Sequence, residues 1–351
     1  MSTDIIKPRL VTDILIKIFK ILGVHDLLSA LLVNREWCQV AVPIYWRAPF
    51  SYKKKRSMLA LKIYRLFLEQ QENDTIHSSQ TTIKTLPTLY DYPFFLKELN
   101  FTNLLELDKD ITNVDAILKM LTSREIRLTT FIMDNTGTNN DKLYGLWTKS
   151  CYAPIISSLV HVEIYTPFPK NCVIKALADN CSNLSHLDIN LYDNHTVRVV
   201  ELINDLNRFF SNQKLLLNLR LVFPKGPGNL LIKVLKSRLE SFKHLELAKW
   251  NFADCDWKWL KKCPNLTEFA VTDPQTQISD ILGIECELHR FKVSKNSKIT
   301  TIHWFLDNKN KKDNKDNKIS SESTFYFHPK KPPAEPYHDE TLEESLQSLI
   351  I

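Results

Sequence analysis

The stretch Leu184-Ser-His-Leu187-Asp-Ile189 contains the pattern that decides the fold of most of this chain. An apolar residue is followed by two residues of any kind, a second apolar residue, one residue of any kind and a third apolar residue. The pattern occurs eight times, at Leu96/Leu99/Phe101, Leu128/Phe131/Met133, Leu159/Val162/Ile164, Leu184/Leu187/Ile189, Leu216/Leu219/Leu221, Phe242/Leu245/Leu247, Leu266/Phe269/Val271 and Leu288/Phe291/Val293. Successive units start 22 to 32 residues apart, a spacing that indicates a repeat array.

Segments of helical character, such as 173–178 and 257–260, lie between these short apolar strands. Strand–helix units of this length stack into a solenoid with a parallel sheet on one side. The junctions Cys181-Ser-Asn-Leu184 and Cys263-Pro-Asn-Leu266 resemble those of cysteine-containing leucine-rich repeats. The resemblance implies an α/β leucine-rich-repeat solenoid, with a curved parallel sheet on its concave side and helices on its convex side. Because each cysteine stands alone in its repeat, we interpret both as buried packing thiols.

The residues that flank the middle apolar position of each unit are expected to point out of the sheet on its concave face, because side chains alternate along a strand. They are Glu98, Asn100, His161, Glu163, His186, Asp188, Asn218, Arg220, His244, Glu246, Glu268, Ala270, Arg290 and Lys292. This face is acidic towards the first repeats and basic near the last. We predict a recognition surface for a protein substrate, with binding carried by Glu98, His161, Glu163, His186, Asp188, Arg220, His244, Glu246, Arg290 and Lys292.

Stacked histidines and acids also raise the alternative of a zinc site. The unit that contains His244 is separated from those of His161 and His186 by another repeat, so the sequence favours a hydrogen-bonding surface and predicts no metal. Histidines titrate near neutral pH, so we expect binding at this surface to be sensitive to mild acid.

The first 46 residues carry three short amphipathic segments. Their apolar positions have helical spacing: Ile14, Leu15, Ile18, Phe19 and Leu22; then Leu27, Leu28, Leu31 and Leu32 after Asp26; then Trp37, Val40 and Ala41. We expect Gly23 to end the first helix in a left-handed cap and Pro43 to end the third. About 40 residues is near the lower limit for an independent core, so these helices either begin a larger core or are completed by a partner.

This stretch resembles an F-box in the order and spacing of Leu10, Ile14, Leu15, Ile18, Phe19, Leu22, Asp26, Leu27, Leu28, Val33, Arg35, Trp37, Val40, Ala41 and Trp46. The F-box family docks onto the Skp adaptor of cullin–RING ubiquitin ligases. The resemblance therefore implies an adaptor-binding role for Leu10, Ile14, Leu15, Ile18, Phe19, Leu22, Leu27, Val33 and Trp37. The family usually has proline directly after the first leucine, where this chain has Val11; this departure leaves the strength of adaptor binding open.

The patterns divide the chain into four expected parts. An F-box-like domain at 1–50 is followed by a helical linker at 51–93, with a polar loop over 69–85, and by the repeats at 94–306. A capping strand is expected at Ile299/Ile302/Trp304, which follows the last unit after only 11 residues. The remainder, 307–351, combines a low-complexity Lys/Asn/Asp loop, an edge strand at 325–327, a proline-rich segment and an acidic tail.

Composition and motifs exclude several classes of function. A net charge of +6 is small for a chain of 351 residues and does not indicate nucleic-acid binding. The sequence has no apolar run of membrane-spanning length, and its seven cysteines without a Cys-x-x-Cys pair favour reduced thiols in the cytoplasm or nucleus. It has no catalytic motif and no phosphate-binding glycine loop, so we predict a non-catalytic ligase subunit without a cofactor. The alternative is a repeat scaffold unconnected to ubiquitin, whose N-terminal helices cap the solenoid.

Overall fold

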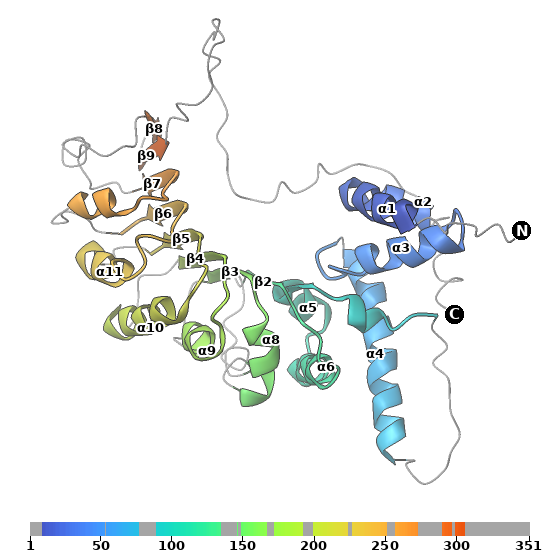
Figure 1. Cartoon of the computed structure of the whole chain (residues 1–351). Coiled ribbons are helices and arrows are strands. Elements are labelled where there is room, and N and C mark those ends of the chain that lie inside the picture. The colour runs from blue at the N-terminus through green and yellow to red at the C-terminus, as the bar shows by residue number, and fades with distance from the viewer. Residues whose placement is uncertain are drawn as a thin grey trace, which may run out of the picture. The chain divides into compact units, whose positions relative to one another are not determined.

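The computed structural model describes residues 9–52, 54–76, 89–134, 146, 149–166, 172–191, 199–223, 227–250, 257–272, 290–296 and 299–305. An N-terminal helical region is followed by an α/β region built on a mostly parallel sheet (Figure 1). Among the described residues, no helix has the length and apolar character needed to cross a membrane.

The N-terminal region contains the three predicted helices and a fourth, longer one. They are α1 (Arg9–Ile21), α2 (Val24–Leu31), α3 (Arg35–Tyr45) and α4 (Lys54–Ile76). The polar loop predicted from residue 69 therefore starts too early, because α4 continues to Ile76. Its Glu69-Gln-Gln-Glu segment consists of good helix formers, and this propensity outweighs the polarity on which the loop prediction rested.

Two predictions about helix ends are wrong. Gly23 does not close α1 in a left-handed conformation; its φ of −66° and ψ of 163° are extended, and it is the N-cap of α2, which starts at Val24 rather than after Asp26. Pro43 lies inside α3. A proline inside a helix lacks a backbone donor and crowds the carbonyl four residues earlier, yet the helix continues beyond Pro43, since the Trp46 amide donates to the carbonyl of Val42 at 2.9 Å.

Helix α4 packs beside the start of the α/β region. Tyr64 and Phe67 are fully buried, and the Tyr64 ring meets that of Phe50 edge-on at 5.2 Å. The Arg56 guanidinium, in the first turn of α4, lies 4.7 Å from the ring centroids of both Tyr45, the last residue of α3, and Tyr52, in the segment between the two helices; both are cation–π contacts.

Seven parallel strands stand side by side in chain order. They are β1 (Glu98–Asn100), β2 (Thr130–Asp134), β3 (His161–Thr166), β4 (His186–Leu191), β5 (Asn218–Val222), β6 (His244–Ala248) and β7 (Glu268–Thr272). The segments between them contain α5 (Phe101–Leu107), α6 (Ile111–Ser123), η2 (Ser150–Tyr152), α8 (Ala153–Ser157), α9 (Cys172–Asn180), α10 (Val199–Asn212), α11 (Gly228–Leu235) and η3 (Trp257–Lys262), and η1 (Tyr92–Phe95) precedes β1. Figure 1 shows α8 to α11 along the same side of the sheet.

The predicted repeat units coincide with these strands. In each of the first seven units all three apolar side chains are at most 3% exposed. Burying three such residues per unit supplies the hydrophobic stabilisation that no single unit could provide alone. Gln213 is completely buried and binds the turn between α9 and β4. Its side chain accepts from the Leu184 amide at 3.1 Å and donates to the Cys181 carbonyl at 2.6 Å.

One backbone arrangement recurs before every parallel strand. A single carbonyl accepts hydrogen bonds from two successive amides at the start of the next strand. For β1 to β7 in turn, the accepting carbonyls are those of Arg47, Lys97, Thr129, Val160, Ser185, Leu217 and Lys243. The first of them belongs to the N-terminal region, so the turn after α3 holds β1 just as each repeat holds the strand that follows it.

The eighth unit does not continue the parallel order. Strand β8 (Arg290–Asn296) pairs antiparallel with β9 (Ile299–Phe305), and β9 lies between β8 and β7. The hairpin forms because only residues 297 and 298 separate the two strands, and a connection this short permits antiparallel pairing alone. The strand predicted at Ile299/Ile302/Trp304 is confirmed as β9, but it does not cap the sheet, because β8 occupies the edge position beyond it. The helix predicted at 257–260 is the 3₁₀ helix η3.

Candidate functional site

The core of the N-terminal helices is built from part of the predicted adaptor-binding set. Leu15, Phe19 and Leu27 are 7%, 1% and 4% exposed. The Phe19 ring meets the ring of Trp37 edge-on at 5.2 Å, which joins α1 to α3. These three buried side chains therefore hold the helices together and are not available to a partner without unfolding.

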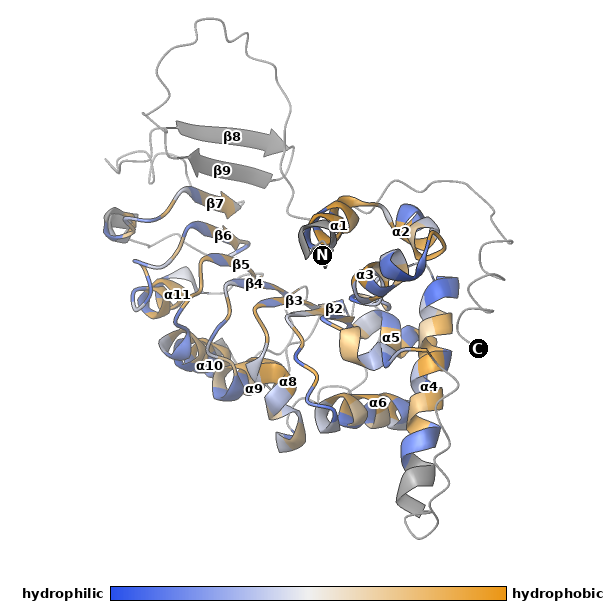
Figure 2. Ribbon diagram, turned by 45° about the vertical axis from the view of Figure 1, so that its right-hand side comes forward, coloured by the Kyte–Doolittle hydropathy of each residue, from blue (hydrophilic) through white to orange (hydrophobic). Residues whose placement is uncertain are grey.

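A second group of apolar residues in this region faces solvent. We call it the exposed apolar set: Ile14, Ile18, Ile21, Leu32 and Val33, which are 48%, 42%, 84%, 51% and 56% exposed. Ile14, Ile18 and Ile21 have the spacing of one helix face, separate from the face that buries Leu15 and Phe19. Figure 2 shows the hydrophobic colour over much of α1.

Comparison with known proteins addresses this helical region. Residues 12–51 match the family model described as F-box-like. These residues form an F-box-like domain. The match spans α2, α3 and most of α1. No curated protein matches the chain.

The predicted adaptor-binding residues thus divide by exposure. Ile14, Ile18 and Val33 are exposed, Leu22 and Trp37 are half-buried, and Leu15, Phe19 and Leu27 are in the core. The side chain of Leu10 lies outside the described residues. Sequence reasoning missed Ile21 and Leu32 as surface residues, although the helical spacing from Ile14 and Ile18 signals the position of Ile21.

The second candidate surface is formed by residues of the sheet that alternate with its buried core. The strand register sorts them into two columns, which together we call the polar face. The first column is Glu98, Thr130, His161, His186, Asn218, His244 and Glu268; the second is Asn100, Ile132, Glu163, Asp188, Arg220, Glu246 and Ala270.

An ion-pair network occupies the middle of the second column. An Arg220 Nη atom lies 3.1 Å from an Asp188 carboxylate oxygen, and Arg220 Nε lies 3.0 Å from Glu246. The Tyr165 hydroxyl donates to Asp188 at 2.6 Å. Asp188 is only 2% exposed, and its burial raises the pKa of the carboxyl although Arg220 acts in the opposite direction. Asp188 is therefore a buried acid that depends on Arg220 for its charge.

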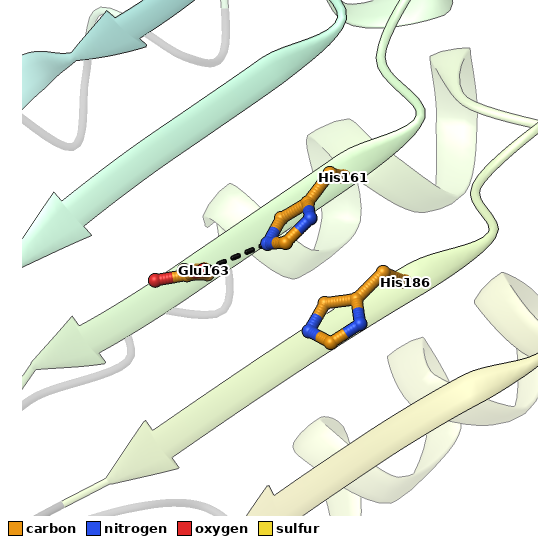
Figure 3. Close-up of side chains that lie close together, drawn as sticks. All are labelled: His161, Glu163 and His186. Atoms are coloured by element: carbon orange, nitrogen blue, oxygen red, sulfur yellow. Dashed lines mark hydrogen bonds and ion pairs between the residues drawn. The ribbon is translucent and has the colours of Figure 1, made fainter. Parts of the chain in front are cut away.

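Two histidines and a glutamate meet on strands β3 and β4 (Figure 3). The rings of His161 and His186 stack with centroids 4.1 Å apart, and His161 Nε2 lies 2.7 Å from Glu163 Oε1. Burial, followed by the charge of His161, lowers the pKa of His186 to about 4. Burial alone would raise the pKa of Glu163, but its hydrogen bond with His161 and the charges of both histidines bring that pKa below its usual value.

The remaining predicted residues lie at the two ends of the polar face. Ser51 donates to Glu98 at 3.0 Å, and His244 Nδ1 lies 3.1 Å from Glu268. By backbone register, Arg290 continues the first column and Lys292 the second, but β9 separates both from β7. The expected step directly from Glu268 to Arg290 is therefore wrong. The side chains of β8 and β9 lie outside the described residues.

Sequence reasoning missed two residues that extend this surface. Tyr165 follows Glu163 by two positions, so the same alternation that identified Glu163 would have placed it on the polar face had the strand been read one step further. His303 of β9 occupies the second column between Ala270 and Lys292 by register. His303 was not assigned to this surface because residues 299–304 were interpreted only as a capping strand.

Proposed function

We propose that this protein is the substrate-recognition subunit of an SCF-type ubiquitin ligase. The F-box-like domain is the basis, because F-box domains typically bind the Skp adaptor of cullin–RING ligases and are generally non-catalytic. The observation that carries the proposal is the exposed apolar set: five of the twelve large apolar side chains exposed in the described chain lie within residues 14–33. Such a concentration is typical of a protein-binding surface.

The α/β region is proposed to be a leucine-rich-repeat solenoid that holds the target. Seven units with the same three buried positions, seven parallel strands in chain order and helices along one side support this assignment. The polar face is the proposed target surface, since it presents paired charges and half-buried histidines in columns. Holding the target near a ubiquitin-charged enzyme accelerates transfer by effective concentration and requires no catalytic residue in this chain.

Adaptor docking is tested by titrating the full chain with a purified Skp adaptor in a calorimeter. Ile14 and Ile18 are 48% and 42% exposed, so together they expose almost the surface of one full isoleucine. Burying that apolar surface in an interface contributes about 1.5–3 kcal/mol to binding. Ile14→Asp/Ile18→Asp should therefore weaken adaptor binding at least tenfold, because two charges would also have to be desolvated. The matched control is Val200→Asp/Leu215→Asp, at residues that are 66% and 59% exposed outside the F-box-like domain.

The control pair should bind the adaptor as the unchanged chain does. Equal affinity of both double variants would contradict docking through α1. Absence of binding by the unchanged chain would contradict the ligase assignment itself.

The second candidate is a repeat scaffold whose N-terminal helices act as a cap. The carbonyl of Arg47 favours it, because it holds the Lys97 and Glu98 amides at 2.9 and 3.0 Å in the arrangement found before every later strand. A cap of this kind needs no exposed apolar side chains. Adaptor binding therefore separates the two candidates: a scaffold should not bind a Skp adaptor at all.

A further inference from the structure

The polar face brings three metal-ligating side chains together on strands β3 and β4. His161 and His186 are directly opposite each other in the β3–β4 register, and Glu163 follows His161 by two residues on the same face. One ligand atom from each of the three can be chosen so that all lie within 4.8 Å of one another. In Figure 3 both imidazole rings and the carboxylate stand on the same side of the two strands.

His186 has a ring nitrogen that can act as a ligand. Among the described residues, its ring nitrogens have no hydrogen-bond partner, and its ring stacks on that of His161 with centroids 4.1 Å apart. An imidazole nitrogen is a ligand that zinc accepts.

We propose that His161, Glu163 and His186 form a binding site for a divalent transition-metal ion of the zinc class. Two imidazole nitrogens and one carboxylate oxygen are a donor set that zinc accepts, with bonds of about 2.0–2.2 Å and neighbouring ligand atoms roughly 3.3 Å apart. His161 Nε2 and Glu163 Oε1 are 2.7 Å apart, and all three ligand atoms lie within 4.8 Å of one another. Small side-chain rotations would therefore bring the three donor atoms to the spacing that zinc requires.

The position on the polar face defines what such an ion could do. Three protein ligands leave a fourth tetrahedral position open, and the His161 side chain is 34% exposed, so the ion would be reachable from solvent. A water or a side chain of a bound protein would complete the coordination. The expectation of no metal rested on the separation of His244, which lies two strands from His186 and pairs with Glu268 on the neighbouring strand. The triad forms without His244.

The residues around the triad determine the affinity expected for the metal ion. Asp188 is engaged by Tyr165 and Arg220 and does not compete for the ion. In the described part of the chain, neither histidine donates its second ring nitrogen to an acceptor. Outer partners of that kind typically contribute 10–100-fold in affinity, so binding should be that much weaker than at a fully supported zinc site.

The test uses the full chain, stripped with EDTA and titrated with Co²⁺ as a spectroscopic probe. We expect one Co²⁺ per chain, with the visible bands of a low-coordinate site, no thiolate-to-cobalt charge-transfer band, and displacement by Zn²⁺. His186→Asn should weaken binding at least tenfold. The matched control His244→Asn, which replaces a histidine in the same column, should change the affinity by less than twofold.

Thermal melts in EDTA show whether each variant folds, and Glu163→Gln replaces His186→Asn if the latter does not. Added Zn²⁺ should raise the melting temperature of the unchanged chain and of His244→Asn, but not of the triad variant, because only a folded site gains from the ion. The proposal is overturned if Co²⁺ does not bind, if its spectrum shows thiolate ligation, or if the triad variant binds as well as the control.

Discussion

Replacing Arg220 with methionine tests the physical account of the polar face. Methionine has similar length but no charge, so Asp188 loses the cation 3.1 Å from its carboxylate and keeps only the Tyr165 hydroxyl as a donor in the network. Asp188 is 2% exposed and cannot recover a hydration shell. Breaking a buried ion pair from one side costs about 3–5 kcal/mol, because an uncompensated charge remains. We therefore expect Arg220→Met to lower the free energy of unfolding by that amount at neutral pH.

The destabilisation caused by Arg220→Met should depend on pH in a definite direction. The pKa of Asp188 is raised in the folded protein, with burial as the main cause and Arg220 as an opposing influence. For an acid with a raised folded pKa, stability falls as pH rises above the unfolded value, since the folded state then resists ionisation. Removing Arg220 raises this pKa further. The destabilisation by Arg220→Met should therefore be larger at pH 7.5 than at pH 4.5.

A double-mutant cycle measured by urea unfolding isolates the pair. Asp188→Asn keeps an acceptor for Tyr165 but needs no counterion, so Arg220→Met/Asp188→Asn should recover at least about 1.5 kcal/mol of the loss. If the two single effects add within about 0.5 kcal/mol, the charges are not coupled. That result, or a greater loss at pH 4.5 than at pH 7.5, refutes the reasoning.

Three further predictions address burial at other positions. Phe19→Ala should destabilise the N-terminal helices by about 3–5 kcal/mol, seen as faster hydrogen exchange across α1 and α3, because the ring is 1% exposed and its loss leaves a cavity; unchanged exchange would contradict its place in the core. Gln213→Leu should cost about 2–5 kcal/mol in urea unfolding, since two buried backbone groups lose their partners; a cost below about 1 kcal/mol would mean that water replaces the amide. Burial raises the pKa values of Cys181 and Cys263 to about 11 and about 12, so iodoacetamide at pH 8 should label both far more slowly than exposed Cys151, as followed by mass spectrometry; equal rates would show that the thiols are accessible.

The repeat spacing predicted the seven parallel strands because the signal was redundant. Each unit places three apolar residues at fixed offsets, and a strand with that pattern can bury all three only against its neighbours. The polar columns followed from simple alternation along the same strands. At the C-terminal end, by contrast, the units containing Phe291 and Trp304 fit the spacing but form a hairpin, since a two-residue connection overrides a side-chain pattern.

Exposure in the N-terminal helices could not be read from residue type. Ile14 and Leu15 are adjacent and equally apolar, yet one is 48% and the other 7% exposed. The face of α1 that turns inward is the one on which Phe19 meets Trp37 of α3, a tertiary contact that residue type does not predict. Likewise, Gly23 and Pro43 were assigned conventional roles at helix ends, but Gly23 is the N-cap of α2 and Pro43 lies inside α3.

The shared use of the Arg47 carbonyl has a mechanical consequence. Because the α3 turn is held to β1 by the same two hydrogen bonds that hold each strand to the next, the region proposed to dock and the region proposed to bind a target are joined by backbone hydrogen bonds and not by a flexible linker. Under the proposed function, the distance between the bound target and the docking region is set by the number of strands between them, at about 4.8 Å per strand. A target bound one strand further along would then present a different lysine for ubiquitin transfer.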